Sequence, residues 1–154
     1  MDWLLDQGLD INFGGHRTVK GADRMCRDNT CAVLNEAAAS GDIALFDHLV
    51  ARGAKPSRSN ALHFATRCHD ANKVVAMISH LIKKCDLDVN ADTSCGGLNE
   101  FLEFEPSPGS PLNHAVIASN AAAADALLRY GAKIGVAEKL ANSPEMKEVF
   151  SKRR

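Results

Sequence analysis

Aromatic side chains are scarce in this chain of 154 residues, in which Phe, Trp and Tyr together make up 5%. Alanine is abundant instead, with 23 residues. A composition rich in small side chains and poor in rings favours helices whose axes pack closely. The apolar fraction of 45% and the charged fraction of 24% are ordinary for a globular protein. The length predicts a single domain over residues 1–154.

Net charge is also low, and the number of cysteines is odd. A formal charge of −1 at pH 7 gives no overall field that would attract nucleic acid or an anionic membrane, so we expect neither as a partner. The five cysteines are odd in number and irregularly spaced, which favours reduced thiols and an intracellular location, cytoplasmic or nuclear. No apolar run approaches the roughly 18 residues that a membrane-spanning helix needs.

Three segments of the chain resemble one another. Each starts with a short run centred on a leucine, and these runs read Val33-Leu-Asn-Glu-Ala-Ala, Ala61-Leu-His-Phe-Ala and Pro111-Leu-Asn-His-Ala-Val. The corresponding endings read Leu49-Val-Ala-Arg-Gly-Ala-Lys, Leu81-Ile-Lys-Lys-Cys-Asp-Leu-Asp-Val-Asn and Leu127-Leu-Arg-Tyr-Gly-Ala-Lys. A fourth, partial copy opens the chain as Leu4-Leu-Asp-Gln-Gly-Leu-Asp-Ile-Asn. A recurring unit of this kind indicates a repeat architecture.

The starts of the predicted helices carry capping signals. Ser110 before Pro111 is a serine N-cap followed by proline at the first helical position, and Ser143 before Pro144 has the same form. Asn60 is expected to cap the second copy in the same way. Two short closing helices are predicted within 136–154.

Each copy is predicted to contain a second helix after a turn, which in the first copy lies near Ser40-Gly41. The apolar face of that helix is predicted to consist of Leu45, Phe46, Leu49 and Val50. Gly53 and Gly131 follow the second helix of their copies, where a left-handed cap favours glycine. Such a helix–turn–helix unit cannot bury its apolar face alone, so neighbouring copies must stack.

The pattern resembles the ankyrin repeat, in which the first helix begins T-P-L-H-x-A and the second ends L-L-x-x-G-A-D-x-N. The matching starts here are Ser110-Pro-Leu-Asn-His-Ala and Asn60-Ala-Leu-His-Phe-Ala. The resemblance implies an all-α fold, an ankyrin-type helical solenoid of about three repeats with partial terminal capping helices. Its parts would be a partial repeat at 1–12, repeats at 31–57, 60–90 and 110–134, and a C-terminal cap at 136–154.

The spacing of the copies departs from that family. Leu34 and Leu62 are 28 residues apart and Leu62 and Leu112 are 50 apart, against about 33 in an ankyrin repeat. The second interval contains an acidic insert at 91–109, with four acidic and no basic residues. The connection at 13–30 instead has four basic and two acidic residues. Long loops of this kind are often functional.

The resemblance implies a protein–protein interaction scaffold, because ankyrin proteins bind partners with their finger tips and the exposed positions of their first helices. Transferred to this chain, these positions are Ala39, Ser40, Ser57, Arg58, Arg67, Cys68, His69, Ile117 and Ala118. In the insert, Phe101 and Phe104 either pin a solvated loop to the helices or form an aromatic docking element for the partner protein. His63 occupies the histidine position of the motif, which implies that its ring ties the loop backbone.

Two other classes of function stay open. The first is a small enzyme whose groove beside the 91–109 insert holds a small molecule near Arg67, Cys68 and His69. The second is a purely structural spacer between domains. The repeat domain of a larger regulatory protein belongs instead to the interpretation as an interaction scaffold. No catalytic residue is assigned, because the sequence carries no nucleophile signature. Gly14-Gly15 lacks the context of a phosphate loop, so no cofactor is expected. Cys68, His69 and His80 have no metal-ligand spacing, so no metal is expected either.

The repeat register makes a testable prediction about stability. Leu62 and Leu112 hold the same apolar position of their copies, and we expect both to be buried between helices. Leu62→Ala or Leu112→Ala should each lower the free energy of unfolding by about 2–5 kcal/mol, measured by thermal or urea denaturation. A loss no larger than that of a surface substitution would show that the register is wrong.

Overall fold

The computed structural model describes residues 6–8, 10–12, 31–91 and 109–152, and these residues form helices and turns with no strand among them. The expected all-α class is therefore confirmed for this part of the chain. The helices are α2 (Ala32–Ser40), α3 (Ile43–Ala51), the 3-10 turn η1 (Pro56–Arg58), α4 (Ala61–Ala65), α5 (Ala71–Lys83), α6 (Pro111–Ile117), α7 (Ala121–Arg129), α8 (Ala137–Leu140) and α9 (Pro144–Ser151). No helix in the described ranges is long and apolar enough to span a membrane.

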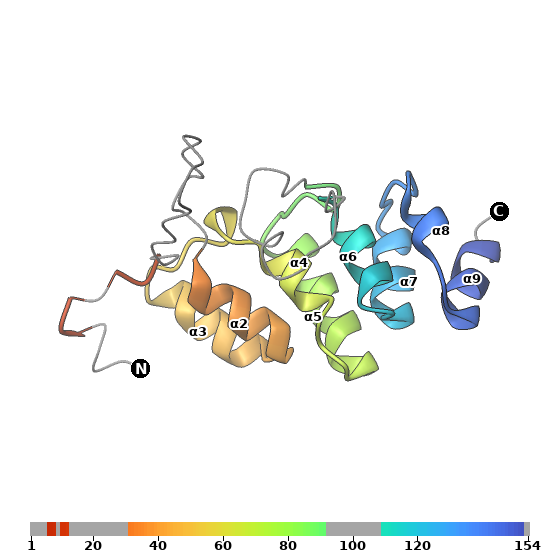
Figure 1. Cartoon of the computed structure of the whole chain (residues 1–154). Helices are drawn as coiled ribbons and strands as arrows, with labels where there is room; N and C mark the ends of the chain where they lie inside the picture. The colour runs from red at the N-terminus through yellow and green to blue at the C-terminus, as the bar shows by residue number, and fades with distance from the viewer. Residues whose placement is uncertain (1–5, 9, 13–30, 92–108, 153–154) are drawn as a thin grey trace, which may run out of the picture.

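The helices are arranged as consecutive pairs that follow one another in a row (Figure 1). The first helices form one layer, in which α2 contacts α4, α4 contacts α6 and α6 contacts α8. In the second layer α5 contacts α7 and α7 contacts α9. Each pair therefore buries its apolar side against the next pair.

The core between the two layers is aliphatic. Its largest fully buried side chains include Leu34, Phe46, Leu49, Met77, Ile78, Leu81, Leu112, Leu127 and Met146. Leu62 is also buried, so the predicted burial of both Leu62 and Leu112 is confirmed. Alanines fill the remaining core positions of the first helices, among them Ala37, Ala38, Ala65 and Ala115. Small side chains at these positions allow neighbouring helix axes to approach closely.

All three predicted helix starts are found, but only two of the predicted side-chain caps are confirmed and the third is wrong. The Ser110 hydroxyl accepts a hydrogen bond from the Asn113 amide at 3.3 Å, and the Ser143 hydroxyl accepts one from Met146 at 3.2 Å. Asn60 makes no side-chain cap to α4. Its own backbone N–H instead donates to the Asn35 side-chain oxygen of α2 at 2.9 Å. The start of α4 is thus held by the preceding helix pair.

The predicted apolar face of α3 is only partly correct. Phe46 and Leu49 are buried and Val50 is half-buried, but the side chain of Leu45 is 37% exposed. Leu45 itself lies in the first turn of α3, and its amide donates to the capping carboxylate of Asp42 at 2.9 Å.

Side-chain amides join the loops of successive pairs. The side-chain oxygen of Asn12 accepts from the Lys55 amide at 2.8 Å, and its NH₂ group donates to the Gly53 carbonyl at 3.1 Å. The side-chain oxygen of Asn90 accepts from the Lys133 amide, also at 2.8 Å. These bonds supply partners for backbone groups in the loops that follow the second helix of a pair.

Glycine has a left-handed backbone conformation at two kinds of turn: after the second helix of a pair, and between the two helices of a pair. Gly53, which follows α3, has φ of +100°, and Gly131 after α7 has φ of +86°, as the sequence predicts. Gly41, between α2 and α3, has φ of +70°. A Cβ atom at Gly41 would lie 2.8 Å from the Lys73 Cβ and 2.9 Å from the Cys68 sulfur, whereas one at Gly53 would meet nothing within 4 Å. Gly41 therefore allows the close approach of the next pair.

We expect Gly53→Ala to lower the free energy of unfolding by about 1–2 kcal/mol, which is the cost of a left-handed backbone for a residue with a Cβ. Gly41→Ala should cost about 1–3 kcal/mol more, because its Cβ also overpacks the contact with Cys68 and Lys73. Urea denaturation of the two variants measures this difference. Equal losses would contradict the close approach at Gly41.

Candidate functional site

An open depression of about 370 Å³ lies on the layer of first helices, lined by Glu36, Ala39, Arg67, His69 and Ala118. These residues come from α2, from the segment after α4 and from the residue after α6. Ala39, Arg67, His69 and Ala118 are among the residues predicted to contact a partner, and the structure brings them together. Glu36 was not predicted, although it lies one helical turn before Ala39 on the same face of α2.

The segment that carries Arg67 and His69 is fixed by hydrogen bonds from both sides. The Thr66 hydroxyl, which is buried, donates to the His63 carbonyl at 2.7 Å. From the next pair, the NH₂ group of Asn120 donates to the carbonyls of Thr66 at 2.9 Å and Cys68 at 2.7 Å. The backbone between α4 and α5 therefore has a defined position relative to α7.

Asn120 has two roles, of which only one is visible in the sequence. Its side-chain oxygen accepts from the Ala123 amide at 3.0 Å, so it is the N-cap of α7. An asparagine before an alanine-rich helix is an ordinary signal for a cap. Its bonds to Thr66 and Cys68 span more than fifty residues, and no local pattern predicts them.

The guanidinium group of Arg67 has an oriented position over an aromatic ring. Its central carbon lies 5.4 Å from the centroid of the Phe64 ring, within the range of a cation–π interaction. Among the ion pairs of the described residues, none includes Arg67 or Glu36. Both side chains are exposed and line the depression, and they form no ion pair with each other.

The other predicted contact residues lie in three different settings. Ile117 is 41% exposed beside Ala118, which confirms the predicted exposed apolar side chain. Ser40 is exposed at the end of α2, whereas Ser57 and Arg58 are exposed on η1 and do not line the depression. Phe101, Phe104 and almost all of the 91–109 insert lie outside the described residues.

The prediction that Cys68 is an exposed contact residue is wrong. The residue is only 5% exposed, and its sulfur faces the turn at Gly41. The thiol donates a long hydrogen bond to the Asp70 carbonyl at 3.8 Å. The close approach of α2 and α5 at Gly41 covers this side chain, so only Arg67 and His69 of the predicted trio are exposed.

His63 ties loop backbone, as the resemblance implies. Its Nε2 lies 2.9 Å from the Gly109 carbonyl and 3.2 Å from the Ala91 carbonyl. Both partners are acceptors, so this nitrogen carries the proton. The bonds bring together the two described residues that flank the 92–108 segment.

The ring of His114 meets that of His63 edge-on, with 5.3 Å between centroids. Burial, and secondly the neighbouring His63, lower the pKa of His114 to about 4. His114 is therefore neutral at pH 7. Its Nε2 has no hydrogen-bond partner in the described part of the chain.

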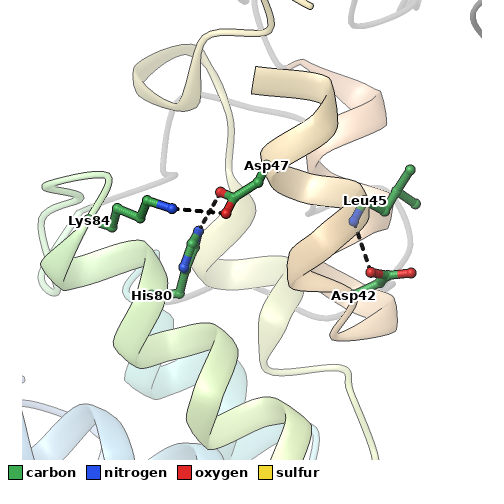
Figure 2. Close-up of polar contacts among 5 residues, drawn as sticks. All are labelled: Asp42, Leu45, Asp47, His80 and Lys84. Carbon is green, nitrogen blue, oxygen red and sulfur yellow. Dashed lines mark hydrogen bonds and ion pairs between the residues drawn. The ribbon is translucent and has the colours of Figure 1, made fainter. Parts of the chain in front are cut away.

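A polar cluster on the layer of second helices links α3 to α5 (Figure 2). The Asp47 carboxylate lies 2.8 Å from His80 Nε2 and 2.9 Å from Lys84 Nζ. The hydrogen bond from Lys84, and next that from His80, lower the pKa of the Asp47 carboxyl group. Because the Asp47 and Lys84 side chains are well exposed, this cluster contributes little to stability. Among the described residues, no group of three His, Cys, Asp or Glu side chains is placed to hold a metal ion.

Comparison with known proteins gives no further assignment, since no protein-family model and no curated protein matches the chain.

We expect Asn120→Ser to lower the free energy of unfolding by about 1–2 kcal/mol. Serine preserves the cap of α7, but the two bonds to the Thr66 and Cys68 carbonyls are lost. Asp42→Ser is the matched control, because the Asp42 carboxylate is likewise an N-cap acceptor and serine again preserves the cap. Denaturation measures both losses, and amide hydrogen exchange should be faster at Arg67–Asp70 only in Asn120→Ser. Similar losses and unchanged exchange would mean that Asn120 acts only as a cap.

Proposed function

We propose that this chain is a protein-binding module, built as an ankyrin-type helical solenoid of about three repeats with terminal capping helices. The partner protein would lie across the layer of first helices. The observation that carries this proposal is the depression at Glu36, Ala39, Arg67, His69 and Ala118, which gathers side chains from three consecutive helix pairs.

Support for the repeat comes from a buried polar residue at the same position of three first helices. Asn35, His63 and Asn113 hold the same position of α2, α4 and α6, and they are 4%, 3% and 7% exposed. Asn35 accepts from the backbone at Asn60, and His63 bonds to the backbone at Gly109. Both tie a first helix to the chain that enters the next one. The shared burial at this position supports one structural unit used three times, although Asn113 differs from the other two because its side-chain oxygen has no hydrogen-bond partner in the described part of the chain.

Support for binding comes from the character of the surface. Ala39 and Ala118 line the depression with small side chains, and the neighbouring Ile117 adds an exposed apolar side chain. The Arg67 guanidinium group lies over the Phe64 ring. Arginine and exposed apolar residues are common at the centres of protein interfaces. The alternative of a small enzyme draws no support from Cys68, because its thiol is buried and away from the depression.

Site-specific photo-crosslinking tests the proposal. A benzophenone amino acid would replace Ala39 or Ala118 in the depression, or Ala44 as the control on the exposed flank of α3. After irradiation in a lysate of the source cells, we expect the first two variants to capture the same protein and the control to capture much less of it. Arg67→Glu should weaken that capture about tenfold, because arginine anchors contribute strongly to interfaces.

Comparison of the Ala44 variant with the Ala39 and Ala118 variants separates crosslinking to a bound partner from nonspecific crosslinking. Equal capture from Ala44, or no protein captured from either Ala39 or Ala118, would contradict a partner on the layer of first helices.

A further inference from the structure

A second cavity lies on the layer of second helices, away from the depression described above. Its volume is about 570 Å³, and it opens to solvent between α5 and α7, which are in contact with each other (Figure 1). The residues that line it are Asn72, Val75, Ala76, Ser79, Ala126, Arg129 and Tyr130. A volume of this size is typical of sites that hold small molecules.

The lining residues follow helical periodicity on both helices. From Asn72 to Ser79 they lie at i, i+3, i+4 and i+7 of α5, and from Ala126 to Tyr130 they lie at i, i+3 and i+4 along α7 and its cap. Residues at these intervals share one face of a helix. Each helix therefore lines the cavity with one continuous stripe, and the stripe of α5 rises by about 10 Å over its seven steps.

The middle of the cavity is apolar. Val75 and Ala76 lie between the two polar residues of the α5 stripe, and Ala126 lies one helical turn before Tyr130. The side chain of Val75 is 41% exposed. A hydrocarbon chain that covered these three side chains would remove their surface from water, which is favourable.

One end of the cavity is polar and carries a hydroxyl proton without an acceptor. The Tyr130 hydroxyl donates to the Ser79 hydroxyl oxygen at 2.8 Å, so the ends of the two stripes meet there. Two hydroxyl groups carry two protons, and the bond between them uses one. In the described part of the chain, the second proton has no acceptor. A ligand atom that accepts a hydrogen bond would satisfy it.

A positive charge lies at the same end. Lys83 is one helical turn after Ser79 on α5, and its ammonium nitrogen lies 5.6 Å from the centroid of the Tyr130 ring. The hydrogen bond with Ser79 is the largest cause that lowers the pKa of the Tyr130 hydroxyl, and the nearby Lys83 ammonium adds to it. The polar end of the cavity is therefore electropositive around its two hydroxyl groups.

The Lys83 charge is not compensated by an ion pair. Among the described residues no ion pair includes Lys83, whereas Arg129 is paired with Asp125 at 2.6 Å. The carbonyl groups at the C-terminal ends of α5 and α7 oppose an anion. A preference for an anionic group at this end therefore depends on Lys83.

We propose that this cavity binds a small carboxylate with an unbranched apolar chain, that is, a medium-chain fatty acid. The chain lies on Val75, Ala76 and Ala126. The carboxylate accepts the remaining hydroxyl proton of the Ser79–Tyr130 pair and lies beside the Lys83 ammonium group. This site goes beyond the proposed function, because it belongs to the layer of second helices and shares no lining residue with the depression.

Three ligands with the same chain and different head groups test the chemistry of the site. Octanoate is the probe, and octanol and octylammonium are the controls. NMR titration of the isotope-labelled full chain measures each Kd and locates the site. We expect octanoate to shift the amide signals of 72–83 and 126–130 and to bind at least about tenfold more tightly than octylammonium, whose charge would meet that of Lys83. Equal binding of octylammonium, or shifts confined to other parts of the chain, would overturn the inference.

The variant Lys83→Gln tests the charge at the polar end. It should weaken octanoate binding about three- to tenfold and leave octanol binding unchanged, because glutamine removes the charge and remains polar. Lys73→Gln is the matched control, since Lys73 is also exposed on α5 but does not line the cavity. It should change neither Kd. Equal weakening by both variants would show that octanoate responds only to the overall charge, and this would contradict the assigned carboxylate position.

The variant Ala76→Phe tests the apolar part of the cavity. Ala76 is exposed, so the added ring would occupy the cavity without entering the core. It should weaken octanoate binding at least about tenfold by displacing the chain from its apolar contacts. Ala44→Phe is the matched control on the exposed flank of α3, and thermal denaturation verifies that both variants fold. Unchanged octanoate binding by folded Ala76→Phe would overturn the cavity as the site.

Discussion

The order of the first three helix pairs depends on a buried polar tie in each of the two first helices α2 and α4. The side chains of Asn35 and His63 are almost fully buried, and each bonds to backbone at the entrance of the next helix pair. Aliphatic contacts between the pairs supply most of the driving force for stacking, but they are not directional and allow pairs to slide. A buried polar group that loses its partner costs about 1–3 kcal/mol, so these ties select one register among the possible ones.

The candidate site is a consequence of that register. Glu36 and Ala39 come from α2, Arg67 and His69 come from the segment after α4, and Ala118 directly follows α6. Asn120, at the start of α7, then holds the backbone that carries Arg67 and His69 by donating hydrogen bonds to the Thr66 and Cys68 carbonyls. The result is a surface whose side chains are separated by many residues in the sequence and have fixed positions relative to each other. Such preorganisation lowers the entropic cost of binding a partner.

The outcome of each sequence-based expectation follows from the range of the interaction involved. The Ser110 and Ser143 caps were predicted correctly because each hydroxyl bonds to an amide three residues later. Asn60 was assigned the same role by its residue type, but its contact comes from Asn35 on another helix. Cys68 was expected to be exposed, yet the close approach of the chain at Gly41 covers it. Glu36 and Asn120 were missed because their roles at the site depend on neighbouring pairs.

The sequence by itself determined the all-helical class, the helix starts at Ser110 and Ser143, and the burial of Leu62 and Leu112. These features depend on periodicity and on hydrogen bonds within a few residues of each other. Only the tertiary structure decided that Glu36, Arg67 and Ala118 share one depression and that Cys68 does not. The physical reason is that stacking of the pairs sets the distances between residues of different units. A local pattern of side chains contains no information about that packing.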